Sequence, residues 1–188
     1  MTYDILLAGV GGQGVLSLAA IIAESAMAEG LFVRQSEVHG MSQRGGGVSA
    51  HLRLSDTKIA GDLIPRGKAD MILSMEPLES LRYLEWLKAD GALISASEPF
   101  TNISNYPDLE MLYKKIALLP KVHLVKTAEL AKQAGNAKAV NMVLIGAALK
   151  FLPLKLQTVE NSVQRRFAQK DPKLVEINLK ALELGQNA

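Results

Sequence analysis

The sequence predicts an α/β fold with a doubly wound, mostly parallel sheet, a β-hairpin insertion and a C-terminal helical lobe. Its first apolar run, 5–8, leads into a glycine-rich turn at 9–14 and then into a helical segment, as in the opening unit of Rossmann-like sheets. Strand-like and helical segments then alternate as far as residue 136, and the rest of the chain is helical. The 188 residues suffice for one domain with a substantial core.

The first three elements follow from apolar runs and glycine positions. A buried parallel strand is expected over 4–10, because its centre carries no polar residue. The following helix is expected over 13–29, and Gly30 ends it. A second strand is expected over 31–36. The apolar N-terminal region lacks a preceding basic segment and is interrupted by glycines, so we expect neither a signal peptide nor a membrane span.

The next stretch is expected to be a loop followed by a hairpin. Residues 37–47 break every periodicity, which predicts the loop. Over 48–55 apolar and polar side chains alternate, which indicates a half-buried strand with one polar face. A turn at 56–58 then predicts a return strand near Ile59 and therefore a β-hairpin. The polar positions of the strand are Ser49, His51, Arg53 and Ser55.

The later elements alternate until the chain becomes helical. Thr127 is expected to cap a helix that stops at Gly135. Asp171 is expected to begin the last helix, and Gly185 to close it. Strands are expected at 70–75, 92–95 and 121–125, and helices at 77–88, 108–117, 127–134, 138–151, around 159–167 and after 171.

The composition is that of an ordinary globular protein, with 48% hydrophobic and 21% charged residues. A formal net charge of +2, without blocks of like charge, gives no support to nucleic-acid or membrane-surface binding. We therefore expect a cytoplasmic protein. The chain has no cysteine, which excludes disulfides, a cysteine nucleophile and cysteine-ligated iron–sulfur clusters within it. Its three histidines lack metal-ligand spacing, and no metal site is expected.

The glycine turn is the first candidate site. Three of its glycines have the spacing G-x-G-x-x-G, which allows a tight turn, close approach of an anion and close packing of helix on strand. The helix N-terminus that follows favours an anion or a phosphate-bearing cofactor. A dinucleotide site also requires an acid at the end of the second strand, and Glu37 lies near that position. The glycines can instead serve only for packing. The candidate anion- or cofactor-binding residues are Gly9, Gly11, Gly12, Gln13 and Gly14.

The second glycine cluster is the more unusual feature. Arg44 precedes three successive glycines, and an arginine in so open a loop can make a two-pronged contact with a carboxylate or phosphate, which makes it the catalytic candidate. His51 and His123 are expected to be ordinary satisfied or solvated histidines. Asn141, a polar residue within an apolar helix, is expected to bond neighbouring backbone. The candidate active-site or partner loop comprises Ser36, Glu37, His39, Gly40, Gln43, Arg44, Gly45 and Gly46.

These residues resemble the gamma-type domain of 2-oxoacid:ferredoxin oxidoreductases. The string Ser-Glu-Val-His-Gly-Met-Ser-Gln-Arg-Gly-Gly at 36–46 is the specific part, and it is similar to the indolepyruvate branch of this family, the beta subunits of indolepyruvate ferredoxin oxidoreductases. The turn 9–15 and the stretch 141–147 continue the match. The resemblance covers nearly the whole chain as a single gamma-type domain, 1–188. Ile59, Pro65, Asp70 and Glu76 also fit it.

The resemblance implies a reaction that this chain does not perform alone. The family oxidatively decarboxylates a 2-oxoacid, here an arylpyruvate, to acyl-CoA with thiamine diphosphate, iron–sulfur clusters and coenzyme A, and ferredoxin takes the electrons. The chain has no cysteine for a cluster, and Gly61-Asp62-Leu63 departs from the Gly-Asp-Gly that begins a thiamine diphosphate motif. The resemblance therefore implies a large partner subunit that bears thiamine diphosphate and the clusters, with ferredoxin contacted indirectly.

Within such a complex, the loop 36–47 is expected to reach the partner's active site, where Arg44 meets an anionic group. The polar face of 48–55 with this loop is the surface expected to meet the partner. Two other functions stay open at this point. One is a free-standing NAD(P)-binding dehydrogenase or reductase, which would bind nicotinamide as an isolated chain, and the other is a nucleotide-free interaction module.

Overall fold

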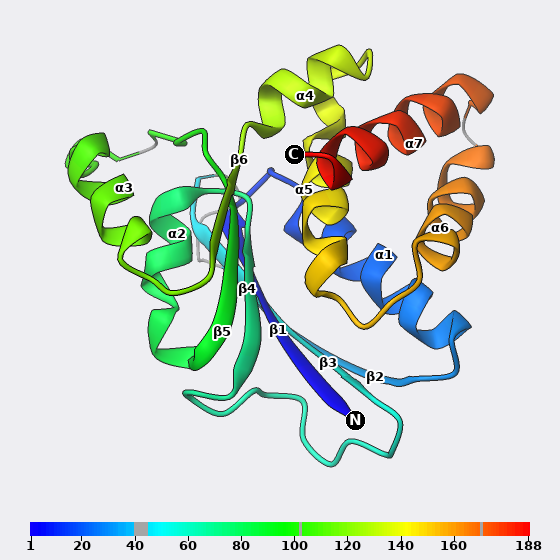
Figure 1. The fold of residues 1–188 in the computed structure, drawn as a ribbon, viewed down its shortest axis with the longest axis horizontal. Coiled ribbons are helices and arrows are strands. Elements are labelled where there is room, and N and C mark those ends of the chain that lie inside the picture. Colours follow the sequence, from blue (N-terminus) through cyan, green and yellow to red (C-terminus); the bar gives the residue numbers. More distant parts are fainter. Residues whose placement is uncertain (40–44, 102, 170) are drawn as a thin grey trace.

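The computed structural model describes residues 1–39, 45–101, 103–169 and 171–188, with His39 described in its backbone only. Within these ranges six strands form one sheet in the order β2-β3-β1-β4-β5-β6 (Figure 1). β3 is antiparallel to both β1 and β2, and the other neighbouring pairs are parallel. The strands are β1 (Thr2–Val10), β2 (Phe32–His39), β3 (Gly47–Ser55), β4 (Ala69–Ser74), β5 (Leu87–Ala96) and β6 (Val122–Val125).

Helices cover both faces of the sheet, as Figure 1 shows. The four helices on the right of that view, α1, α5, α6 and α7, pack on one another over one face. α2 and α3 cover the opposite face, and α4 lies at the top. The predicted doubly wound, mostly parallel sheet with a C-terminal helical lobe is confirmed. The helices are α1 (Val15–Ala28), α2 (Pro77–Arg82), α3 (Leu109–Ala117), α4 (Thr127–Gln133), α5 (Val140–Ala148), α6 (Leu156–Ala168) and α7 (Pro172–Gln186).

The hairpin lies one strand earlier than predicted. β2 and β3 are antiparallel neighbours, with Phe32 opposite Ser55 and His39 opposite Val48. Residues 56–68 are all described and form no strand, so the expected return strand near Ile59 is wrong. The turn after β3 does occur, but the chain beyond it contains glycines and a proline, which pair poorly in a sheet. Because β2 continues to His39, Glu37 belongs to a strand and not to the predicted loop.

The polar face of β3 is covered, which corrects the expectation of a half-exposed strand. Ser49, His51 and Ser55 are all buried. The segment 56–68 and a 3-10 turn, η1 (Leu84–Trp86), lie over this face, because His51 Nδ1 accepts the Ile64 N–H at 3.1 Å and its ring meets the Trp86 ring edge-on. The alternation of residues therefore predicted correctly which face of β3 is polar, but the inference that the polar face is exposed was wrong.

Two predicted helix ends also differ. The helix expected over 77–88 ends at Arg82, and β5 begins at Leu87, where it pairs with Ala69 of β4. Gly185 lies inside α7 and not at its end. A Cβ on Gly185 would lie 1.9 Å from the Val143 carbonyl oxygen, so this glycine lets α7 pack directly on the backbone of α5. Glycine here serves close packing rather than helix termination.

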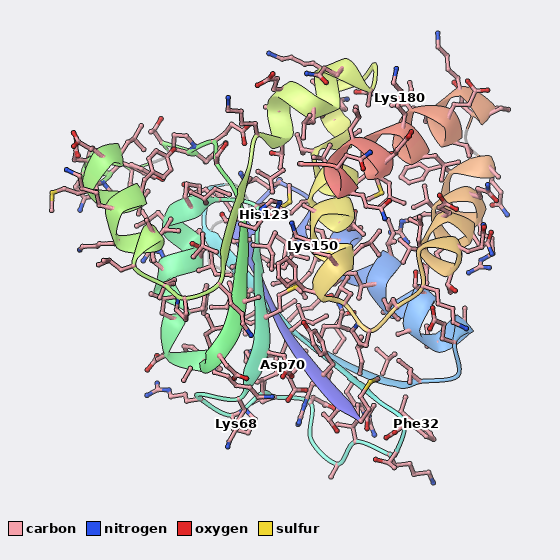
Figure 2. All side chains as sticks on the ribbon, viewed as in Figure 1. Phe32, Lys68, Asp70, His123, Lys150 and Lys180 are labelled. Atoms are coloured by element: carbon pink, nitrogen blue, oxygen red, sulfur yellow. The ribbon has the colours of Figure 1, made fainter. Side chains whose placement is uncertain are left out.

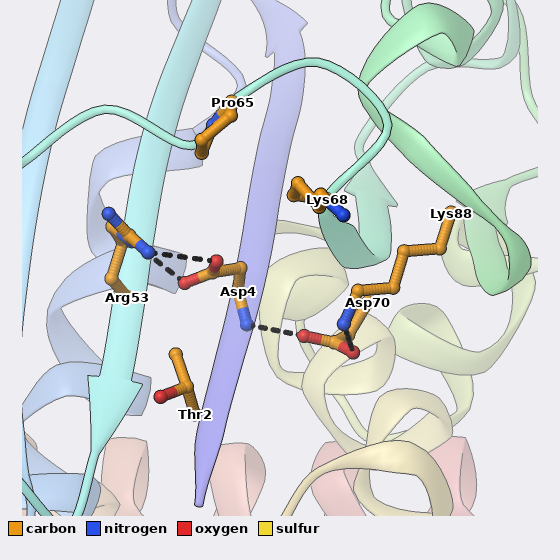
Figure 3. A pocket seen from close by; sticks show the side chains of 7 residues that line it. All are labelled: Thr2, Asp4, Arg53, Pro65, Lys68, Asp70 and Lys88. Atoms are coloured by element: carbon orange, nitrogen blue, oxygen red, sulfur yellow. Dashed lines mark hydrogen bonds and ion pairs between the residues drawn. The ribbon is translucent and has the colours of Figure 1, made fainter.

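The amino-terminal edge of the sheet carries a closed network of charges (Figure 3). Arg53 Nε and Nη2 donate to the two oxygens of the Asp4 carboxylate at 2.9 and 3.2 Å. Arg53 Nη1 also donates to the carbonyls of Gly61 and Leu63, which fastens the 56–68 segment. Asp70 beside it accepts the Asp4 N–H at 2.8 Å and pairs with Lys88.

Candidate functional site

The candidate site lies at the opposite, carboxyl-terminal edge of the parallel strands. The chain passes from β1 into α1 on one face and from β4 into α2 on the other, and ligands of α/β sheets bind at such a switch point. A cavity of about 500 Å³ opens there. It is lined by Gly12, Gln13, Gly14, Met75, Ala96, Glu98, Pro99, Phe100, Thr127, Ala128, Lys138, Val140 and Asn141.

The glycine turn forms one wall of this cavity. Gly12 (φ 100°) and Gly14 (φ 89°) have left-handed backbones that favour glycine, and Gly14 is the residue from which α1 starts. Gly9 serves packing, because a Cβ there would lie 2.7 Å from Val15 Cγ2. The Gly11 N–H, which a dinucleotide fingerprint would turn toward pyrophosphate, donates instead to the Gly46 carbonyl at 2.8 Å. The turn thus keeps the cradle shape while one amide is committed to the β2–β3 hairpin.

Gln13 holds the turn against β4. Its Oε1 accepts the Val10 N–H at 2.7 Å, and its Nε2 donates to the Met75 carbonyl at 3.4 Å. The Gln13 N–H itself donates to the Val10 carbonyl at 3.0 Å. The side chain lines the cavity, but both of its polar atoms are engaged within the protein. Its observed contacts fix the distance between the ends of β1 and β4.

The acid expected to hold a ribose is in the wrong place for that contact. Glu37 lies opposite Ala50 of β3, which lies opposite Leu7 of β1. Since neighbouring strands are about 4.8 Å apart, two strand spacings separate Glu37 from β1 by roughly 10 Å. Glu37 is also level with Leu7 and not with the turn after Val10. The inserted strand β3 therefore removes the main support for the NAD(P)-dehydrogenase interpretation.

A buried carboxylate at the end of β4 fixes the far wall. Glu76 is 1% exposed, and its Oε2 accepts the Glu79 N–H at 2.8 Å while its Oε1 accepts the Phe100 N–H at 3.2 Å and the Tyr106 hydroxyl. Burial, together with this bond to Glu76, raises the pKa of Tyr106. Tyr113 donates its hydroxyl to the Ser97 carbonyl at 2.6 Å. Sequence reasoning noted Glu76 only within the family resemblance and missed this function.

A second carboxylate corrects the expected cap of α4. Thr127 was expected to accept a backbone N–H, but its hydroxyl donates to Glu98 Oε2 at 3.0 Å. Glu98 Oε1 accepts the Ala128 N–H at 2.8 Å, so a residue from the loop after β5 caps the helix. A carboxylate is favourable at a helix N-terminus because it satisfies a free N–H group. A long-range cap leaves no signal in local sequence spacing.

The remaining wall brings a cation and an amide to the cavity. Lys138 is exposed and is the cation among the lining residues. Asn141 Oδ1 accepts the Met142 N–H at 3.1 Å, and its Nδ2 lies 3.7 Å from the position that a Cβ on Gly14 would take. Phe100 presents an exposed ring on the other side. The cavity thus combines glycine backbone, one ammonium group, the Glu98 carboxylate engaged at the start of α4, and apolar walls.

The two glycine clusters of the sequence meet at this edge. Gly45 (φ 81°) and Gly46 end the hairpin connection, and Gly46 contacts the turn through its bond from Gly11. Ser36 lies opposite His51 and is half-buried. Gly40, Gln43 and Arg44, which include the catalytic candidate, lie outside the described residues, as does the His39 side chain.

Two further titratable groups have unusual surroundings. Glu79 lies beneath Gly47, whose Cβ position is 3.0 Å from Glu79 Oε2. Burial raises the pKa of Glu79, although Arg82 Nε donates to its Oε1 at 2.8 Å. His123 of β6 lies near Lys150 (Figure 2), and burial and that ammonium lower its pKa. Among the described residues Glu79 Oε2 and His123 Nε2 are buried without a partner, so the expected satisfied or solvated state is wrong for His123 and correct for His51.

The described residues contain no group of three or more His, Cys, Asp or Glu side chains able to hold a metal ion. Of the helices described, none is long and apolar enough to cross a membrane.

Comparisons with known proteins agree with this geometry. Residues 4–188 match the family model described as pyruvate ferredoxin/flavodoxin oxidoreductase. The chain is 38% identical to indolepyruvate oxidoreductase subunit IorB of Pyrococcus horikoshii, covering 99% of this chain and 95% of that protein. It superposes on pyruvate oxidoreductase subunit PORC of Thermotoga maritima with a TM-score of 0.77 at 22% identity, covering 99% and 96% of the two chains.

A second structure contains the same fold within a longer chain. The 2-oxoglutarate:ferredoxin oxidoreductase of Magnetococcus marinus, solved with 2-oxoglutarate, coenzyme A and succinyl-CoA bound, matches with a TM-score of 0.78 at 21% identity. The match covers 99% of this chain and 30% of that one. From the family model and the full-length relative, this chain belongs to the pyruvate ferredoxin/flavodoxin oxidoreductase family.

Proposed function

We propose that this chain is the cofactor-free subunit of an arylpyruvate-type 2-oxoacid:ferredoxin oxidoreductase in the cytoplasm, with indolepyruvate as the representative substrate. The observation that carries the proposal is its end-to-end similarity to an indolepyruvate oxidoreductase subunit. In the reaction the 2-oxoacid loses carbon dioxide, its acyl group is joined to the sulfur of coenzyme A with release of the thiol proton, and the two electrons released pass to ferredoxin.

The cofactors of this reaction are assigned to a large partner subunit, because the residues of this chain do not fit them. Iron–sulfur clusters need cysteine ligands, and the chain has none. The Gly61–Leu63 segment lies on the exposed chain after β3, where two of its carbonyls accept bonds from Arg53. It lacks the Gly-Asp-Gly motif with which a site for metal-bound diphosphate would begin, and its Gly61 and Leu63 carbonyls are already engaged.

This chain's own contribution is placed at the carboxyl edge. We assign the loop 36–47 to the partner's active site, with Arg44 meeting an anionic group there. We assign the neighbouring cavity to a phosphate-bearing part of coenzyme A, held by the amides at Gly12 and Gly14 and by Lys138, beside Asn141. The bond from Gly11 to Gly46 supports both assignments, because it holds the base of the loop against the cavity wall.

The test is reconstitution with the partner subunit, scored by indolepyruvate-dependent reduction of ferredoxin. Neither subunit alone should turn over. Arg44→Ala should lower kcat/KM about tenfold or more with assembly unchanged, as expected for losing one charge-assisted contact. Unchanged assembly together with unchanged turnover would exclude this function for Arg44.

The cavity assignment is tested separately. Lys138→Glu should raise the KM for coenzyme A about tenfold while the KM for the 2-oxoacid stays constant. Lys132→Glu, an equal charge change on the exposed side of α4, is the control and should leave both constants within about twofold. Calorimetry on the isolated chain tests the dehydrogenase alternative. Our proposal predicts no heat of NAD⁺ binding, whereas a dehydrogenase would bind NAD⁺. Tight NAD⁺ binding without partner association would replace the proposal.

A further inference from the structure

Strand β2 is a long edge strand of the sheet. It pairs with β3 on one side, and among the described residues no strand pairs with its other side. The opposite edge strand, β6, has four residues, whereas β2 has eight. Proteins usually shorten or cover edge strands, because free N–H and C=O groups recruit other strands. The two edges of this sheet are therefore not equally protected, and β2 is the one open to an incoming strand.

The outward face of β2 is also uncovered. Phe32 and Val38 share a face with the polar positions of β3, since they lie opposite Ser55 and Ser49. The segment 56–68 and η1 cover this face over β3, but Phe32 and Val38 are 44% and 55% exposed (Phe32 is labelled in Figure 2). The cover over β2 is thus incomplete. The surface expected to meet a partner is not the face of β3 but its continuation on β2.

A groove beside the strand is cationic as well as apolar. Its volume is about 580 Å³, and its charged lining residues are Arg34 and Lys58. Arg34 lies directly opposite Arg53, an unfavourable like-charge pair. Arg53 is neutralised by Asp4, whereas the ion pair that Arg34 makes among the described residues is with Asp62 at 3.7 Å, and both of those side chains are more than half exposed. An external carboxylate near Arg34 would relieve this repulsion. The lining residues are Phe32, Val33, Arg34, Lys58, Ile59 and Ala60.

We propose that an extended segment of the cofactor-bearing partner subunit, carrying acidic and apolar side chains, adds to the sheet along β2 and lies in this groove. Main-chain pairing supplies affinity in this mode, and alternate side chains supply specificity. The inference rests on the proposed function, which supplies the partner. It gains support from continuity, because β2 runs directly into the loop assigned to that partner's active site. One docking event then fixes both the strand and the loop.

The experiment measures the dissociation constant between the full-length chain and the partner subunit. Val38→Lys and Arg34→Glu should each weaken binding about tenfold or more, because they remove an apolar contact and reverse a charge in the groove. Arg34→Glu should also flatten the dependence of the constant on salt. Leu118→Lys is the matched control, because Leu118 is 85% exposed directly after α3, which leads to β6 at the other edge of the sheet. The dissociation constant of this variant should stay within about twofold of wild type.

Hydrogen exchange on the same complex gives a second readout that does not depend on a variant. The amides of 32–39 should gain protection when the partner binds, while those of β6 should not. A wild-type complex with no protection in β2 and unchanged constants in both variants overturns this inference alone. Absence of any wild-type complex overturns the proposed function as well. A self-dimer that Val38→Lys dissociates, with partner binding unchanged, would assign the edge to a second copy and overturn the proposal.

Discussion

The two edges of the parallel strands use charged residues in different ways. At the amino edge the charged side chains form ion pairs with one another, Arg53 with Asp4 and Lys88 with Asp70 (Figure 3). At the carboxyl edge the buried Glu76 and the half-buried Glu98 accept backbone N–H groups from loops and helices, and Lys138 faces a cavity. Charge pairing at one edge stabilises the sheet, whereas carboxylates at the other give the site its shape. Burial of charge alone therefore does not mark a functional site.

The largest effect on stability is expected for Arg53→Ala at the amino edge. Asp4 is nearly buried, and removal of its cation would leave an uncompensated charge and release the 56–68 segment. We expect a loss of roughly 3–5 kcal/mol in the free energy of unfolding, measured by urea denaturation. Arg34→Ala, directly across the strand pair in an exposed ion pair, is the control and should cost under about 0.5 kcal/mol. Equal costs would mean that the network contributes no more than an exposed pair.

At the carboxyl edge, Glu76→Ala is expected to have the next largest effect on stability. It removes the acceptor of the Phe100 and Glu79 N–H groups and of the Tyr106 hydroxyl, all of them near the cavity wall. We expect a loss of about 2–3 kcal/mol, with increased hydrogen exchange around Phe100. Glu110→Ala, in an exposed pair on α3, should have almost no effect. A destabilised variant with unchanged exchange at Phe100 would contradict the assignment of Glu76 to the wall.

A smaller effect is expected at the cap of α4. Glu98→Ala leaves the Ala128 N–H without its acceptor and should cost about 1 kcal/mol. Thr127→Val removes the donor to Glu98 and should cost less, since the carboxylate still caps the helix. Thermal denaturation of both variants decides between the two residues as cap. A larger loss for Thr127→Val would restore the local cap predicted from sequence.

The smallest effect is a pH dependence from His51. Burial, then the nearby Arg53, lowers the pKa of His51 from its ordinary 6.5, against an opposing effect of Asp4. The unfolded chain therefore binds a proton before the folded one, and stability should fall as the pH falls below about 6.5. Protonation would also remove the acceptor of the Ile64 N–H. The free energy of unfolding, measured by denaturation at several values between about pH 7 and 5, should change less with pH in His51→Gln than in wild type. An equal dependence on pH in the two proteins would contradict this account.

Local patterns in the sequence predicted most elements because they are properties of neighbouring residues. The glycine turn predicted β1 followed by α1, and the capping residue Asp171 correctly marked the start of α7. Strand partners are not local. β3 lies between β1 and β2 in the sheet. The sequence did not predict this order, because the turn at 56–58 is as strong a hairpin signal as the β2–β3 connection.

The site was predicted in part for the same reason. The glycine turn and the segment ending at Gly46 were recognisable as motifs, and the structure brings them together. Glu76 caps α2 locally through the Glu79 N–H, ahead of Pro77, which a sequence pattern could have indicated. Its bond to the Phe100 N–H and the bond of Glu98 to the Ala128 N–H join residues more than twenty positions apart, so no spacing pattern predicts them. Gly185 was mistaken for a helix end because the sequence does not distinguish a glycine needed for conformation from one needed for contact.

The packing of α7 on α5 has a consequence for how the protein is made. The backbones meet at Gly146 and Gly185, where Cβ atoms would lie 2.0 and 1.9 Å from carbonyl oxygens of the other helix. α5 begins at Val140, in the wall of the cavity, yet its packing partner is synthesised later. On the ribosome the sheet can therefore form before α5 has its neighbour. We therefore expect the α5 wall of the cavity to reach its final packing only after the α7 segment has been synthesised.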